Sequence, residues 1–218
     1  MHFHIITLFP GAFESYLGES ILKRAIEDKK LKVSFYNPRD FAPQNTEGKA
    51  VRIDKPPYAG GPGMVIQAEP VIKAIAAAVK KSSKKNKPKI IFLSPGGKQF
   101  TNEYAKATAK KHKDVIIVSG RYEGIDARIK KVFKMEDVSI GPFVLTGGEL
   151  PAMLLIDVIA RQVQGVLGNF DSLEESRVAS HDVYTRPEVF TYKGKKYRVP
   201  KVLLSGDHKK IEEWKKGK

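Results

Sequence analysis

Three short apolar segments of the chain each run directly into a turn that contains glycine. The segments and the turns that follow them are 89–93 with 94–97, 114–118 with 119–124, and 137–140 with 141–148. Short β-branched runs separated by helical patterns are typical of parallel strands that are buried on both faces. Ligands of open α/β sheets bind beyond the carboxyl ends of the strands, and glycine lets the backbone approach them closely. Chain reversal alone explains any single turn, but the three turns together favour one binding pocket.

The charge of the chain favours a polyanionic partner. Its 218 residues carry 39 Lys+Arg against 24 Asp+Glu, a formal net charge of +15. Because no long apolar segment is present, we expect nucleic acid rather than a membrane as the partner; a general richness in lysine is the alternative. The absence of cysteine excludes disulfides and cysteine metal sites and fits a cytoplasmic protein. The first residues read as a strand and not as a targeting segment.

The remaining pattern predicts an alternation of strands and helices around one long loop. Residues 38–66 are rich in glycine and proline and have no steady period; loops of this length are usually functional or disordered. The expected strands and helices outside the three segments above are strands near 3–8 and 32–36, and helices at 16–29, 69–80, 102–111, 124–132 and 149–163.

The expected helix at 149–163 is apolar on nearly all sides. One face of a sheet cannot cover every side of such a helix, so we expect it to lie in a dimer interface, with a central position inside the domain as the alternative. Asp157 and Arg161 stand four residues apart on it. This spacing suits an exposed ion pair, or an arginine that reaches an anion at the edge of a pocket.

The C-terminal part of the chain is basic and contains aromatic residues. We expect a hairpin at 190–199 around Lys193 and Gly194, and a short helix at 207–216. Basic side chains interleaved with aromatic ones favour an RNA-binding surface. A small core under a coat of lysines explains the same composition.

Taken in order, the motifs resemble those of the bacterial tRNA (guanine-N1)-methyltransferases of the SPOUT class. The matching stretches cover nearly the whole chain; they are 5–10, 57–64, 93–97, 120–126, 139–141, 144–152, 165–168, 184–188 and 200–206. The resemblance implies an α/β fold, with a mostly parallel sheet, helices on both faces and a deep trefoil knot, plus a small, mainly helical C-terminal domain. It implies a methyltransferase domain at 1–165, a linker at 166–182 and a tRNA-binding domain at 183–218.

The resemblance also implies a reaction. A methyl group would pass from S-adenosylmethionine to N1 of the guanosine immediately 3′ of the anticodon, in a cytoplasmic homodimer whose site lies at the subunit interface. The tRNA partner would be held by its anticodon stem-loop. The family commonly needs Mg²⁺, although no group of residues in this sequence has metal-ligand spacing. A related enzyme acting on another RNA position and a catalytically silent RNA-binding module are the alternatives.

The resemblance assigns the cofactor to the three turns identified above. The residues that it implies for cofactor binding are Leu93, Ser94, Pro95, Gly96, Gly97, Gly120, Tyr122, Glu123, Gly124, Ser139, Ile140, Gly141, Leu145, Gly147, Gly148 and Pro151. A carboxylate at Glu123 would favour a cationic methyl donor. A favourable position at a helix N-terminus is the other explanation of this acid.

Two catalytic roles follow from the same resemblance. The family's general base is an acidic residue four positions before the Tyr-Thr-Arg-Pro motif, where this chain has Ser180. We therefore predict Asp182 as the base and His181 as the second candidate; a turn carboxylate is the alternative for Asp182. Arg161 matches a family arginine beside the target base and would polarise guanine O6.

Overall fold

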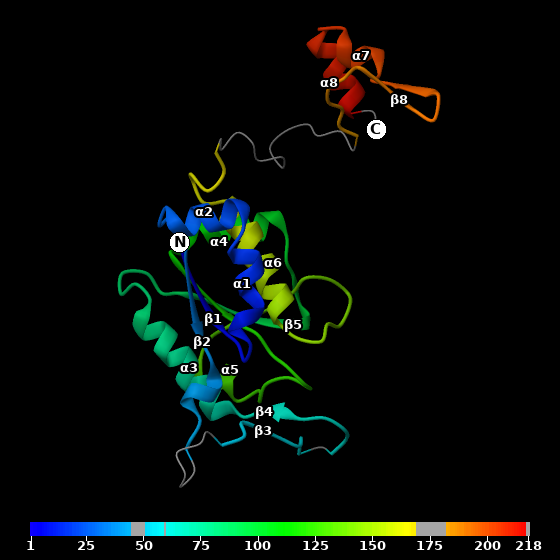
Figure 1. Cartoon of the computed structure of the whole chain (residues 1–218). Helices are drawn as coiled ribbons and strands as arrows, with labels where there is room; N and C mark the ends of the chain where they lie inside the picture. Colours follow the sequence, from blue (N-terminus) through cyan, green and yellow to red (C-terminus); the bar gives the residue numbers. More distant parts are fainter. Residues whose placement is uncertain (45–50, 59, 169–181, 217–218) are drawn as a thin grey trace. The chain divides into compact units, whose positions relative to one another are not determined.

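The computed structural model describes residues 1–44, 51–58, 60–168 and 182–216 (Figure 1). The chain divides into two compact units, Met1–Gly168 and Asn169–Lys218, which are described separately. Most of the predicted linker, 169–181, lies outside the described residues, and so does His181.

The first unit is built on a parallel sheet, as the apolar segments predict. The described residues form five strands in the order β2-β1-β6-β5-β7, all parallel. Their bounds are His2–Ile6 (β1), Lys32–Tyr36 (β2), Lys89–Gln99 (β5), Asp114–Val118 (β6) and Glu136–Ser139 (β7). β6 is buried along its whole length, because helices cover both faces of the sheet (Figure 1).

Two apolar cores lie on the opposite faces of this sheet. One core joins the sheet to α1 (Glu14–Leu17), α2 (Ser20–Glu27), α4 (Asn102–Lys111) and α6 (Glu149–Arg161). The other joins it to α3 (Ala68–Lys81) and α5 (Ile129–Val132). Alternate residues of each strand serve the two cores, since successive side chains of a strand point to opposite faces. The predicted α/β architecture with helices on both faces is confirmed.

Two predicted helices are wrong in their extent. The helix expected at 16–29 is broken, because Gly18 ends α1, Glu19 is extended and α2 starts only at Ser20; the 3-10 helix η1 (Pro10–Phe13) precedes them. The helix expected at 124–132 is reduced to α5. Gly124 has a φ of +122°, and Ile125 forms a parallel bridge to Ile66, so this segment is held as extended chain instead.

Two predicted loops contain regular structure that was missed. The segment 38–66 carries the 3-10 helix η2 (Pro38–Phe41) and a two-stranded antiparallel ladder of β3 (Asp54–Lys55) and β4 (Val65–Ile66). Strand β5 does not end at Leu93. It continues through the predicted turn to Gln99, with a shift of register against β7 between Leu93 and Lys98.

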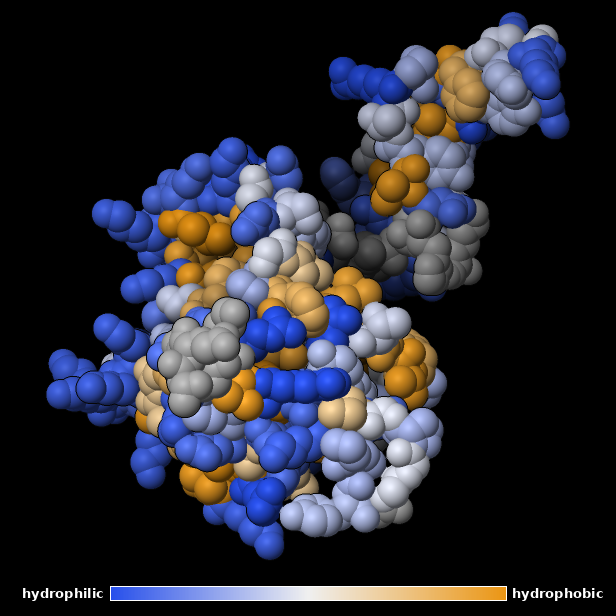
Figure 2. All heavy atoms as spheres, turned by 60° about the horizontal axis from the view of Figure 1, so that its bottom comes forward, coloured by the Kyte–Doolittle hydropathy of each residue, from blue (hydrophilic) through white to orange (hydrophobic). Residues whose placement is uncertain are grey.

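The second unit contains the predicted hairpin and helix. β8 (Val189–Tyr192) pairs with β9 (Lys195–Arg198), and both turn residues, Lys193 and Gly194, have positive φ. Helices α7 (Lys201–Leu204) and α8 (His208–Lys216) follow. No residue that is described in this unit is fully buried. Each unit carries a largely hydrophilic surface with isolated apolar patches on the face shown in Figure 2.

Within the part of the chain that the structure describes, every helix is too short or too polar to cross a lipid bilayer.

Candidate active site

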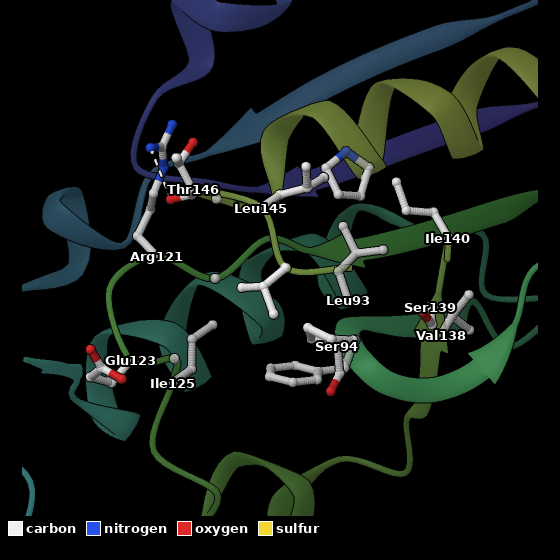
Figure 3. A pocket seen from close by; sticks show the side chains of 18 of the residues that line it. Leu93, Ser94, Arg121, Glu123, Ile125, Val138, Ser139, Ile140, Leu145 and Thr146 are labelled. Atoms are coloured by element: carbon white, nitrogen blue, oxygen red, sulfur yellow. Dashed lines mark hydrogen bonds between the residues drawn. The ribbon is translucent and has the colours of Figure 1, made fainter. Parts of the chain in front are cut away.

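The three glycine-bearing segments meet at one pocket of about 400 Å³ at the carboxyl ends of the strands (Figure 3). All the residues predicted to bind the cofactor line it, from Leu93 to Pro151, except Gly96 and Gly97. Apolar side chains make up much of the wall, and Leu93, Ile125 and Leu145 surround the same space in Figure 3. The structure therefore brings together residues up to 58 positions apart, Leu93 and Pro151, as expected for the ends of neighbouring parallel strands.

Sequence reasoning missed several residues of the pocket wall. Four of them lie inside the predicted turns and two flank a turn by one or two positions, so taking every residue of each turn together with its flanking positions would have found most of them. They are Phe92, Arg121, Ile125, Ala127, Lys130, Val138, Phe143, Val144 and Thr146.

Gly97 has a structural reason to be glycine that is separate from the pocket. A Cβ at this position would lie 2.5 Å from both the carbonyl carbon of Asp137 and the amide nitrogen of Val138. The residue therefore allows β5 and β7 to approach each other. A Cβ at Gly96 would meet nothing within 4 Å, so the two adjacent glycines differ in what they permit.

The segment that follows β7 lies directly against the turn that follows β6. The amide of Gly148 donates a hydrogen bond of 2.9 Å to the carbonyl oxygen of Gly120, and the hydroxyl of Ser119 donates one of 3.2 Å to the carbonyl oxygen of Gly148. A Cβ at Gly148 would lie 2.7 Å from the Cα of Ser119. Only glycine fits this backbone-to-backbone contact, which closes one side of the pocket.

A buried carboxylate below the pocket fixes the same turn. Glu149 is 3% exposed; its Oε2 lies 2.8 Å from Nε of Arg121, and its Oε1 accepts a 2.8 Å hydrogen bond from the hydroxyl of Thr7. The guanidinium of Arg121 also lies 4.6 Å from the centre of the Phe9 ring. Because a buried charge is stable only when it is paired and hydrogen-bonded, this network ties the turn to the segment that follows β1 and to the start of α6. None of these residues was predicted as part of the site.

Glu123 connects the pocket to the long loop. Its amide donates a 3.0 Å hydrogen bond to the carbonyl oxygen of Met64, and a Cβ at Gly63 would lie 2.5 Å from its Oε1. It is the sole acidic side chain among the described residues of the pocket wall. Tyr58, five residues before Gly63 in the same loop, has a fully exposed side chain. The loop therefore borders the pocket at its one negative charge.

The two predicted catalytic residues belong to different units of the chain. Arg161 is the last residue of α6 and is partly exposed. Asp157, which the sequence placed beside it, accepts a 2.8 Å hydrogen bond from the hydroxyl of Tyr16 on α1. Asp182 is exposed and lies in the second unit.

This fold and this pocket define an α/β protein with a nucleoside-sized site at the carboxyl ends of its parallel strands. A family model described as tRNA (Guanine-1)-methyltransferase TrmD matches residues 1–218. The chain therefore belongs to the TrmD family of tRNA (guanine-1)-methyltransferases, and the resemblance drawn from the motifs is confirmed.

Individual relatives agree with the family match. The chain is 42% identical to a tRNA (guanine-N(1)-)-methyltransferase of Clostridioides difficile, covering 99% of this chain and 91% of that protein. It is 46% identical to one of Caldanaerobacter subterraneus, covering 100% and 86%. The crystal structure of the tRNA (m1G37) methyltransferase from Aquifex aeolicus matches with a TM-score of 0.77 and 36% identity, covering 99% of this chain and 87% of that one.

Proposed function

We propose that the protein transfers a methyl group from S-adenosylmethionine to N1 of the guanosine immediately 3′ of the anticodon of tRNA, in the cytoplasm. The observation that carries this proposal is the match of the whole chain to tRNA (guanine-1)-methyltransferases, with four of the matching motifs, 93–97, 120–126, 139–141 and 144–152, contributing to one pocket. The related protein from Aquifex aeolicus is named for the same position, m1G37.

The pocket fits the proposed cofactor. Its volume of about 400 Å³ lies in the range of small-molecule sites, and its wall combines apolar side chains with exposed backbone at glycines. Gly124, next to Glu123, has a positive φ, and a Cβ built on it would meet nothing within 4 Å. Its backbone is therefore accessible to a ligand. An apolar wall suits an adenine ring, and the carboxylate of Glu123 suits a positively charged donor.

S-adenosylmethionine supplies a methyl group on a positively charged sulfur. The bond from the guanine N1 to the methyl carbon forms as the bond from that carbon to sulfur breaks, and the sulfur keeps the bonding electron pair. The proton of N1 must leave to a base, so the protein has to position two reactants and accept one proton. We propose that Asp182 accepts this proton and that Arg161 hydrogen-bonds guanine O6, which favours loss of the N1 proton.

The Asp182→Asn variant tests the role of the base. An amide cannot accept the proton, so we expect turnover of tRNA to fall by roughly 10²–10⁴-fold while the affinity for S-adenosylmethionine stays unchanged. Glu212→Gln, an exposed acid of α8 in the same unit, is the matched control and should retain full activity. Unchanged turnover in Asp182→Asn would remove Asp182 from this role and leave His181 as the candidate.

We also propose a homodimer with the site at the subunit interface. Supporting it, Leu150 and Leu154 stand one turn apart on α6 and are 59% and 38% exposed, although the opposite side of the helix is buried in the core. Leu150→Glu should convert a dimer into a monomer in light scattering. A monomeric wild-type protein would contradict this proposal.

Two finer features of the family complete the proposal. The tight contact of Gly148 with Ser119 and Gly120 supports the trefoil knot, because it carries the chain after β7 across the turn after β6. Glu123, the acidic residue of the described pocket wall, is the carboxylate that we propose for a Mg²⁺ requirement, since this ion commonly uses few protein carboxylates. Activity in EDTA with and without added Mg²⁺ tests that requirement.

The decisive experiment maps the methylated nucleotide. Purified protein is incubated with methyl-labelled S-adenosylmethionine and a tRNA transcript that has guanosine 3′ of its anticodon, and the product is digested and identified. We expect 1-methylguanosine at that position and no incorporation when the guanosine is replaced by adenosine. Methylation at another nucleotide would refute the proposed site, and no methylation of any tRNA would refute the activity.

A further inference from the structure

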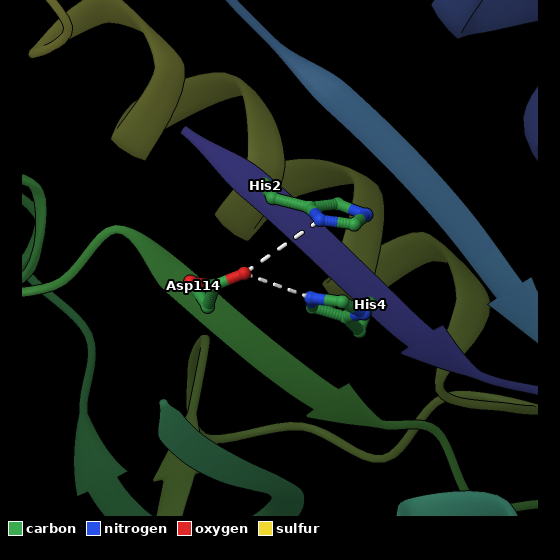
Figure 4. Close-up of side chains that lie close together, drawn as sticks. All are labelled: His2, His4 and Asp114. Carbon is green, nitrogen blue, oxygen red and sulfur yellow. Dashed lines mark hydrogen bonds and ion pairs between the residues drawn. The ribbon is translucent and has the colours of Figure 1, made fainter. Parts of the chain in front are cut away.

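A cluster of polar side chains lies at the amino ends of the strands, opposite the end that bears the pocket (Figure 4). His2 and His4 are alternate residues of β1 and therefore lie on one face of the sheet. β6 pairs with β1 so that Asp114 stands opposite His2. This is the face that α3 covers. Residues 110 positions apart in the sequence are thereby brought together, which corrects the expectation that the chain holds no cluster with metal-ligand spacing.

One atom from each side chain converges on a common point. Nε2 of His4 lies 3.0 Å and Nδ1 of His2 lies 3.6 Å from the same Oδ1 of Asp114. One potential ligand atom of each residue lies within 4.8 Å of the other two. Two imidazole nitrogens and one carboxylate oxygen in this arrangement form a typical ligand set for a transition metal.

The other polar atom of each side chain, which faces away from the common point, forms a hydrogen bond of its own. Nε2 of His2 lies 2.9 Å from the hydroxyl of Ser34, and Nδ1 of His4 lies 3.0 Å from the hydroxyl of Tyr36; both partners are on β2. Oδ2 of Asp114 accepts a 3.1 Å hydrogen bond from the amide of Ser83. Metal-binding histidines and carboxylates are usually oriented by outer partners of this kind.

The histidines can present lone pairs at the common point. A hydroxyl can donate or accept a hydrogen bond. Ser34 and Tyr36 can therefore accept the ring N–H when the facing nitrogen binds an ion in place of the carboxylate of Asp114.

We propose that His2, His4 and Asp114 bind a divalent transition-metal ion of the Zn²⁺ type and that the ion joins the amino ends of β1 and β6. Three protein ligands leave the fourth position of a tetrahedral ion to water. The side chain of His2 is 17% exposed, against 0% for His4 and 6% for Asp114, so an ion enters past His2. The N-terminal amine and Lys32 are positively charged neighbours of this group, so we expect a weaker site than one with four protein ligands.

The test measures binding of zinc chloride by the full chain. The protein is prepared without an affinity tag, with Met1 as its first residue, and dialysed against EDTA and then against buffer. Calorimetry should show one zinc ion per chain, and the thermal midpoint should rise with added zinc but not with magnesium, because the ligand set disfavours Mg²⁺. Absence of binding heat would overturn the proposal.

Variants distinguish this site from binding elsewhere. His2→Gln replaces the most exposed ligand, so the protein should still fold, and zinc affinity should fall by at least roughly 100-fold, beyond the 10–100-fold of an outer-partner loss. The control carries His112→Gln, His181→Gln and His208→Gln together and removes all the other imidazoles; it should bind zinc as the wild type does. Wild-type affinity in His2→Gln, or loss of binding in the control, would show that the ion binds elsewhere and would overturn the proposal.

The outer partners provide an independent measurement. Tyr36→Phe removes the group that orients His4 while leaving all three ligands, and we expect zinc affinity to fall by roughly 10-fold. Cobalt(II) bound to the wild type should give the strong visible absorption of a four-coordinate ion. A weak, six-coordinate spectrum that is the same in His2→Gln would contradict the site.

Discussion

The two ends of the parallel sheet differ in which groups fill them. At the carboxyl end, the segments after β6 and β7 contact each other through backbone at Gly120 and Gly148, and several pocket side chains are exposed, such as Val144 at 82%. At the amino end, the same strands bring together buried polar side chains, His4 and Asp114. One end presents backbone around an open space, and the other fills its space with hydrogen-bonded side chains.

The difference shows how one sheet can separate binding from stability. A ligand at the carboxyl end is held by a shape that only small residues allow, so substitutions there change affinity through the backbone. The amino end is packed with buried polar side chains such as His4 and Asp114, so substitutions there leave polar atoms without partners and change the free energy of unfolding. Variants at the amino end should therefore change stability alone, whereas variants at the carboxyl end should change cofactor affinity, with or without a change in stability.

Glu149→Gln should have the largest effect on stability. It removes a buried charge that Arg121 and Thr7 hold, and we expect the free energy of unfolding to fall by about 3 kcal/mol, at the lower end for a broken buried pair because Arg121 is partly exposed. The affinity for S-adenosylmethionine should fall as well, since the turn that carries Arg121 lines the pocket. Urea unfolding and calorimetry measure the two effects. Glu69→Gln, which breaks an exposed pair on α3, should change neither.

Gly148→Ala should affect both measurements through the backbone. The added Cβ would lie 2.7 Å from the Cα of Ser119, so the segment must move, at a cost of about 2–3 kcal/mol. If this cost falls on the cofactor-bound form, affinity for S-adenosylmethionine drops by roughly 100-fold. Gly96→Ala is the matched control, since its Cβ meets nothing within 4 Å. Equal behaviour of the two alanine variants would contradict the contact.

Asp114→Ala should destabilise the protein without weakening cofactor binding. In EDTA, it leaves the amide of Ser83 and the ring of His4 without their shared partner, and we expect a loss of about 2 kcal/mol in the free energy of unfolding. Affinity for S-adenosylmethionine should stay at the wild-type value. A parallel loss of affinity would show that the two ends of the sheet are coupled and would contradict the independence of stability and cofactor binding.

Tyr36→Phe should give the smallest of these effects. It removes one hydroxyl that is hydrogen-bonded to His4, and in EDTA we expect a loss of about 1 kcal/mol. Tyr16→Phe removes a comparable but exposed hydrogen bond to Asp157 and should cost less. Urea midpoints of the two variants compare a part-buried and an exposed hydrogen bond directly. A larger loss in Tyr16→Phe would contradict the importance of burial at the amino end.

Much of the pocket could be predicted from the sequence because its signals are local. An apolar run followed by glycine marks both the end of a strand and the place where a ligand approaches, and parallel pairing gathers such ends on one edge. The hairpin around Lys193 and Gly194 was equally local, since its turn requires positive φ. Strand β6 and helix α4 have the bounds that the pattern predicted.

Other features depend on partners that are distant in the sequence. Ile125 is held as extended chain by Ile66, and so the helical pattern around it is overridden. Arg121 and Glu149 form their pair only because β6 and α6 lie side by side at the pocket. Neither contact can be predicted from the residues next to it in the sequence. Each residue alone is compatible with an exposed turn or with the start of a helix.

By itself, the sequence determined the alternation of strands and helices, the glycines that open the backbone, and, through its motifs, the family to which the chain belongs. These depend on backbone preferences and spacing, which are properties of short segments. Only the tertiary structure decided that Glu149 is a buried anchor, that Gly97 serves strand packing, and that His2, His4 and Asp114 share one point. Burial and the convergence of side chains arise from the packing of distant segments, so no local pattern can specify them.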